Sequence, residues 1–151
     1  MAGVFEIADG FIETVAKHHP LSATYMGLPG FDHLMADYSP ESADAFHSDS
    51  LLALRAMEAA EPANDRERMC RDTFLDEARL SVEQFESREH LRDMNVLFSP
   101  VQNVRSIFDL MPQDSVEQWE NIASRMEKIG DALAGYRQTL DIGRSEGLVT
   151  S

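Results

Sequence analysis

Cysteine is almost absent from this sequence of 151 residues, in which Cys70 is the single example. No disulfide can form within the chain, and no cysteine pair has the spacing of a zinc site. Long apolar runs are missing too, because charged residues interrupt every candidate within a few positions. The first amphipathic stretch contains Glu6, Asp9 and Glu13 and has no basic leader, unlike a signal peptide. We therefore expect a cytoplasmic protein that does not enter a membrane.

Basic residues are scarce, with 13 Lys and Arg against 27 Asp and Glu, for a formal net charge of −14. Such a surface repels phosphate backbones and anionic lipid headgroups, so we expect neither nucleic acid nor a membrane as a partner. Hydrophobic residues make up 43% of the chain, which is enough to build a core. We predict a single helical domain over residues 1–151.

Sustained alternation of apolar and polar residues is absent, whereas apolar residues at helical spacing are common. The predicted fold is therefore an all-α bundle of about five helices with no significant sheet. Helix starts are marked by a capping side chain, followed by proline or by a glutamate or glutamine three residues later. Together these patterns predict helices over 4–16, 39–60, 64–85, 99–110 and from 115 onward, and a short helix over 22–26 within a Gly- and Pro-rich connector, 18–39.

The last helix carries a narrow apolar seam with spacings of three, four, three and four residues. This spacing is typical of a coiled coil and predicts that the helix packs lengthwise against another long helix. Gly143 is a plausible end for it. The seam consists of Trp119, Ile122, Met126, Ile129, Leu133, Tyr136 and Leu140.

The sequence contains no His-Glu-x-x-His zinc motif, no Gly-x-Ser-x-Gly elbow and no glycine-rich phosphate loop. Cys70 lies on an apolar helix face, where a thiol is expected to be buried and inert. Asp32, His33 and Asp37 could together collect a cation, but turn-capping aspartates beside an exposed histidine are favoured. The other histidines are expected to be structural or solvated rather than metal ligands. They are His18, His19, His47 and His90.

Acidic residues on the 64–85 helix and just after it could be imagined as a metal cage of the helical-bundle type. That cage needs Glu-x-x-His pairs, which are absent, so Glu77, Glu83 and Glu86 are expected to form a solvated face. We therefore predict no catalytic, cofactor-binding or metal-binding residue, and no cofactor, in this chain.

Three stretches carry a family resemblance: residues 19–28 (HPLSATYMGL), 31–34 (FDHL) and 37–41 (DYSPE). In this order they resemble the N-terminal region of the bacterial domain of unknown function 885 family, and the similarity continues through most of the chain. The resemblance implies a large, mostly helical, zincin-like metallopeptidase whose zinc-binding His-Glu-x-x-His helix lies downstream. Nothing here aligns with that helix, so the resemblance implies only a scaffold role, as a wall or lid of a substrate channel.

Three hypotheses follow. The first is an N-terminal helical scaffold of such a protein, inactive alone, whose partner is the missing C-terminal portion. The second is a stand-alone helical interaction protein that self-associates through the Trp119–Leu140 seam. The third is an acidic protein that binds a basic partner, for which net charge is the sole argument.

Overall fold

The computed structural model describes residues 3–149, and within that range it contains helices and no strand. The all-α prediction is therefore confirmed. The 3₁₀ turns are η1 (Glu89–Arg92) and η2 (Ile107–Asp109). The α-helices are α1 (Val4–His18), α2 (Pro20–Tyr25), α3 (Pro40–Glu58), α4 (Asp65–Glu86), α5 (Pro100–Ser106), α6 (Val116–Glu127) and α7 (Ile129–Ser145).

Helix starts fall where the capping signals predict them. At three of them a side-chain oxygen accepts a backbone N–H of the first turn, which satisfies a donor that the helix itself cannot. Ser99 is the exception, because its hydroxyl donates to the side chain of Gln102 instead of accepting from the helix. The three capping bonds are Ser39 from Ser42 at 3.2 Å, Asn64 from Glu67 at 3.0 Å and Ser115 from Gln118 at 3.3 Å.

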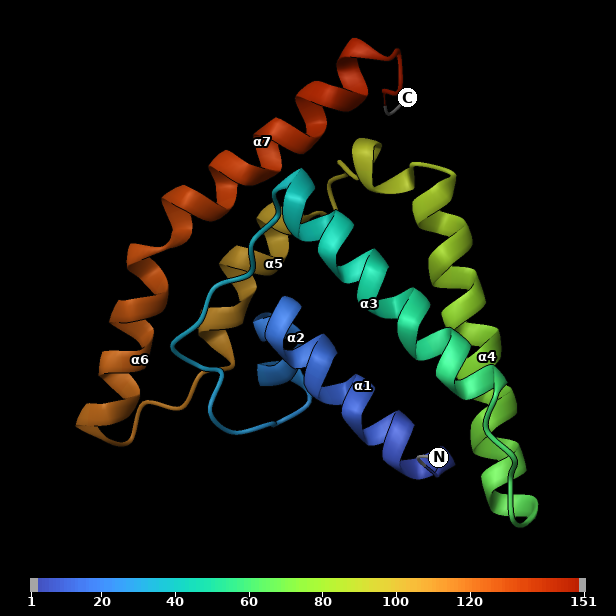
Figure 1. Cartoon of the computed structure of the whole chain (residues 1–151). Helices are drawn as coiled ribbons and strands as arrows, with labels where there is room; N and C mark the ends of the chain where they lie inside the picture. The colour runs from blue at the N-terminus through green and yellow to red at the C-terminus, as the bar shows by residue number, and fades with distance from the viewer. Residues whose placement is uncertain (1–2, 150–151) are drawn as a thin grey trace.

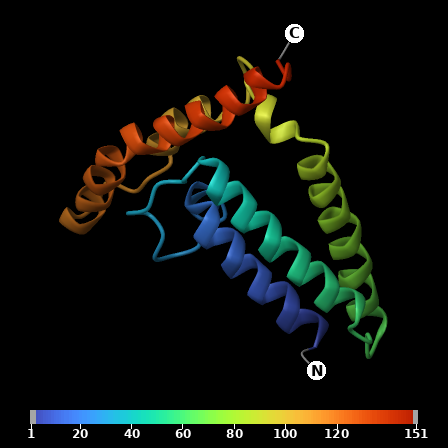
Figure 2. The same cartoon turned by 45° about the horizontal axis from the view of Figure 1, so that its top comes forward.

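The helices form two arms that meet at the top of Figure 1. In one arm α1, α3 and α4 pack side by side, and Figure 2 shows the same group from another angle. In the other arm α6 and α7 follow one another, with α5 and α2 between the arms. Among the described residues, no helix has the length and apolar composition that crossing a bilayer requires. The core of the first arm consists of Val4, Leu54, Met57, Ala60, Leu75 and Ala78.

The long C-terminal helix predicted from residue 115 is present but is divided at Lys128 into α6 and α7. Its predicted seam is only partly buried, because Trp119 is 52% and Met126 56% exposed. The seam is only partly buried because α7 packs against the irregular segment 37–39 and against η1, and not against a long parallel helix. The face of α7 that is buried there consists of Ala132, Gly135, Tyr136, Thr139 and Gly143.

Two glycines make this close packing of α7 possible. A Cβ at Gly135 would lie 2.9 Å from the backbone nitrogen of Ser39, and one at Gly143 would lie 2.1 Å from the carbonyl oxygen of Leu91. Gly143 therefore does not end the helix, as the sequence suggested. The end comes at Gly147, whose φ of 76° is the left-handed conformation of a helix C-terminus.

The connector between α2 and α3 is held by Arg125 of α6, whose side chain is fully buried. Its Nε donates to the carbonyl of Leu34 at 2.7 Å, and its Nη2 donates to the carbonyl of Phe31 at 2.9 Å and to Thr24 Oγ1 at 3.0 Å. The hydroxyl of Thr24 in turn donates to Asp32 at 2.7 Å. One guanidinium thus fixes the path of a loop that has no regular structure of its own.

Candidate functional site

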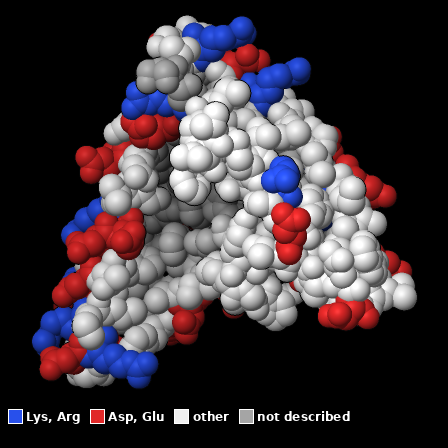
Figure 3. Space-filling view, turned by 180° about the vertical axis from the view of Figure 1, so that it is seen from behind, with Lys and Arg blue, Asp and Glu red and all other residues white. Residues whose placement is uncertain are grey.

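A cleft of about 1170 Å³ opens on the face opposite to that of Figure 1. It lies between the ends of α1 and α4, the first turns of α3, η1 and the segment after η1. The space-filling view in Figure 3 shows this face hollowed and bordered mainly by uncharged side chains, with both acidic and basic groups along the outer edge. The apolar part of the lining comes from Ala43, Phe46, Leu80, Phe85, Met94 and Val149.

An aromatic stack forms part of the cleft wall. The ring of Phe85 lies between His47 and His90, with centroid distances of 4.1 and 4.3 Å and nearly parallel planes. His19 meets Phe46 edge-on at 4.4 Å. Three histidines, from α3, η1 and the α1–α2 junction, are thereby used in ring packing, and of these His19 and His90 line the cleft and add apolar surface to its wall.

Burial lowers the pKa of His90 and of His19, because desolvation disfavours the charged imidazolium. Both rings are therefore neutral near pH 7. Among the described residues, His90 Nδ1 is a buried nitrogen that has no hydrogen-bond partner. The wall of the cleft is consequently aromatic and uncharged at these positions.

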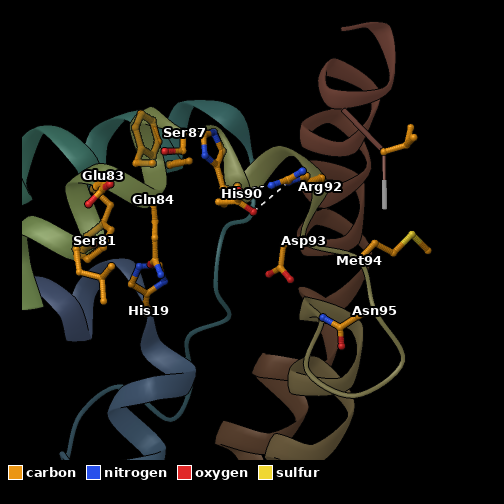
Figure 4. Close-up of a pocket in the computed structure, with 16 residues that line it drawn as sticks. His19, Ser81, Glu83, Gln84, Ser87, His90, Arg92, Asp93, Met94 and Asn95 are labelled. Carbon is orange, nitrogen blue, oxygen red and sulfur yellow. Dashed lines mark hydrogen bonds and ion pairs between the residues drawn. The ribbon is translucent and has the colours of Figure 1, made fainter. Parts of the chain in front are cut away.

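The charged groups of the cleft are three acids and one base. Arg92 pairs with Glu89 within η1, through Nε to Oε2 at 3.0 Å and through a second, shorter contact. Glu83 and Asp93 have no side-chain hydrogen bond or ion pair to any residue within 3–149. Figure 4 shows Glu83 on α4 and Asp93 beyond η1, on the two sides of His90. Desolvation raises the pKa of Asp93, so this carboxylate would gain from a cationic partner.

The three residues that the sequence offered as a cation site, Asp32, His33 and Asp37, each take part in a separate hydrogen bond. Asp32 accepts from Thr24, and Asp37 accepts the backbone N–H of Ser39 at 2.9 Å. His33 is exposed, and its carbonyl accepts from Lys128 Nζ at 2.7 Å. The bond to Asp37 is local turn capping, whereas Asp32 and the His33 carbonyl accept from other elements, Thr24 of α2 and Lys128 between α6 and α7.

The donor set of the described residues does not fit zinc. Nowhere within 3–149 do three or more His, Cys, Asp or Glu side chains converge as a metal site requires. His18 instead pairs with Asp49 at 2.9 Å, and Cys70 is half-buried against the core of the first arm. Glu77, Glu83 and Glu86 are all exposed on α4, and of these only Glu83 lines the large cleft.

An exposed apolar loop borders the cleft and was missed by the sequence reasoning. Between η1 and α5, Val96 is 85%, Leu97 69% and Phe98 77% exposed. Asn95 Oδ1 accepts the backbone N–H groups of Leu97 and Phe98, at 2.9 and 2.7 Å, and so fixes the turn. The sequence does carry a signal for this loop: the run from Met94 to Phe98 is apolar except for Asn95, and it fits neither a helical nor a strand pattern.

Comparison with known families connects this architecture to other proteins. The model of the family "Bacterial protein of unknown function (DUF885)" matches residues 20–151. The chain belongs to this family. The DUF885 match begins at Pro20, the first residue of α2, and takes in the connector, Arg125, the cleft-lining part of α4 and the apolar loop. No curated protein matches the sequence.

Proposed function

We propose that this chain is the N-terminal helical scaffold of a larger, zinc metallopeptidase-like protein, in which it forms one wall of a substrate channel. The observation that supports this most is the pairing of an open cleft with an exposed apolar loop on its border. A contiguous apolar patch at a cleft marks a surface that another molecule or segment covers. A wall needs such a surface and needs no reactive centre of its own.

The zinc implied for such a protein would be held by residues outside this chain. The donor geometry described above does not fit the ion, so no step of hydrolysis is assigned to any position here. What the chain contributes is shape and surface: Phe85 and His90 of the aromatic stack line the space through which a substrate would pass, and the exposed apolar loop Val96–Phe98 follows directly after the lining residues Met94 and Asn95. The chain alone is then without activity.

A second candidate is a stand-alone interaction protein that self-associates through α6. Val116, Trp119 and Met126 are all more than half exposed on that helix, which gives it an apolar strip without a partner in this chain. Burying such a strip against a second copy would stabilise a dimer. We rank this below the scaffold because the cleft and its loop lie on a different part of the molecule and would stay uncovered.

The two candidates are separated by the gene and by the protein in solution. We expect the reading frame to continue past codon 151 into a His-Glu-x-x-His helix, and the longer product to bind zinc and cleave peptides. A stop codon after Ser151, with light scattering that shows a concentration-dependent dimer lost on Trp119→Ala, would favour self-association instead. Stoichiometric zinc in the present chain would contradict both.

A further inference from the structure

We propose that the cleft selects cationic amphipathic peptides, in which a Lys or Arg stands beside apolar side chains. The inference rests on the proposed function for its biological setting, since it names the substrate class of the same cleft. Binding by the present chain is nevertheless a property of residues already in place, and can be measured without the rest of the protein.

The apolar requirement comes from the lining. Phe46, Leu80, Phe85 and Met94 present aromatic and aliphatic surface to the cleft, and His90 extends it as a neutral ring. At about 1170 Å³ the space exceeds that of a usual small-molecule pocket, roughly 300–1000 Å³, and it is open at the surface. Space of this size and openness suits a run of several peptide residues better than an enclosed metabolite.

The charge requirement comes from two carboxylates that the chain leaves without a partner. The cleft has one cation, Arg92, and Glu89 neutralises it, so the net field at the surface of the cleft comes from Glu83 and Asp93. A bound ammonium or guanidinium would pair with them, whereas an acidic peptide would meet two like charges. The net charge of −14 adds long-range attraction for the same ligands.

The positions of the two carboxylates also indicate which arrangement of charges along a peptide fits the cleft. Glu83 lies on α4 and Asp93 in the segment after η1, so cations spaced along a peptide could be met from two walls (Figure 4). A peptide with basic residues on both sides of an apolar pair therefore matches the cleft better than one with a single terminal charge.

The test is a titration of the chain with three fluorescein-labelled hexapeptides that share a Leu-Phe centre and carry Lys, Gln or Glu at the flanking positions. Fluorescence anisotropy should give the lowest Kd for the Lys peptide and the highest for the Glu peptide. Raising salt from about 0.05 M to about 0.5 M should weaken the Lys peptide most, because the Debye length shortens severalfold. Replacing Leu-Phe by Ser-Ser should abolish binding of all three.

Variants locate the site. Glu83→Gln and Asp93→Asn should each raise the Kd of the Lys peptide by about threefold to tenfold and leave the Gln peptide unchanged. The matched controls, Glu120→Gln on α6 and Asp131→Asn on α7, remove the same charge from exposed positions outside the cleft and should have no such effect. Helix content by circular dichroism confirms that each variant is folded.

Two results would overturn the inference. Equal affinity for the Lys and Glu peptides would mean that the carboxylates do not select charge, and equal losses in the cleft and control variants would mean that only the overall acidity attracts the peptide. Either outcome leaves the scaffold proposal standing, because that depends on the zinc and activity of the longer protein. A longer protein that binds no zinc would contradict the scaffold proposal, whereas the peptide measurement would remain valid.

Discussion

Arg125 offers the sharpest test of how the connector is held. Replacing it by methionine keeps most of the side-chain volume and removes the hydrogen bonds to Phe31, Leu34 and Thr24. Thr24 retains Asp32 as a partner, so the loss falls mainly on the two backbone carbonyls. A charge-assisted bond to a buried carbonyl contributes about 1.5–3 kcal/mol, and relief of guanidinium desolvation offsets part of the sum. We expect Arg125→Met to lower the free energy of unfolding by about 3 kcal/mol.

Urea denaturation followed by circular dichroism measures this change, and a thermal scan should show Tm lower by roughly 6–12 °C. Arg125→Lys should recover little, because an ammonium cannot reach both carbonyls with a planar fork. Arg137→Met is the control, since Arg137 is exposed on α7, and it should cost less than about 0.5 kcal/mol. An Arg125→Met protein as stable as the Arg137→Met control would refute the account of the connector.

Four further substitutions test the packing of α7 and the electrostatics of the cleft. Gly143→Ala places a Cβ against the Leu91 carbonyl and should destabilise by about 2 kcal/mol in urea, whereas Gly130→Ala, with open space around it, should stabilise by about 0.5 kcal/mol. Asp93 has its pKa raised in the folded state, so its ionisation costs stability as pH rises above the ordinary value of about 4; Asp93→Asn should therefore gain up to about 0.5 kcal/mol at pH 7 and nothing at pH 3. His90 has its pKa lowered, so the unfolded chain takes up the proton first and stability falls as pH drops through about 6.5; His90→Phe should remove part of that fall between pH 7.5 and 5.5, and a fall as steep as in the parent protein would argue against a buried neutral ring.

Local chemistry accounts for what could be predicted from the sequence. The caps at Ser39, Asn64 and Ser115 each depend on residues within three positions, so their helix starts were correct. The buried face of α7 was harder, because the apolar pattern Leu133 and Leu140 suggested one face while Gly135 and Gly143 made close packing possible on another. Glycines that allow a neighbouring backbone to approach closely do not appear in a pattern of apolar residues, so the sequence does not reveal the face that they form.

The cleft and the buried arginine lay beyond local patterns. The cleft brings His19 and Phe46 together with Asp93, which are separated by up to 74 positions along the chain, and only the packing of α1, α3 and α4 makes them neighbours. Arg125 has the spacing of an ordinary polar residue on an amphipathic helix. Its burial depends on carbonyls that the connector directs toward it, and the path of an irregular loop is not encoded in any periodicity.

The most direct test of the scaffold proposal is the metal content of this chain after dialysis against zinc and then against metal-free buffer. We expect far less than one zinc per chain, together with one zinc per chain in the longer protein treated in the same way. One zinc retained by residues 1–151 alone, and lost on addition of a chelator together with peptide cleavage, would show that the reactive centre lies here and that the proposal is wrong.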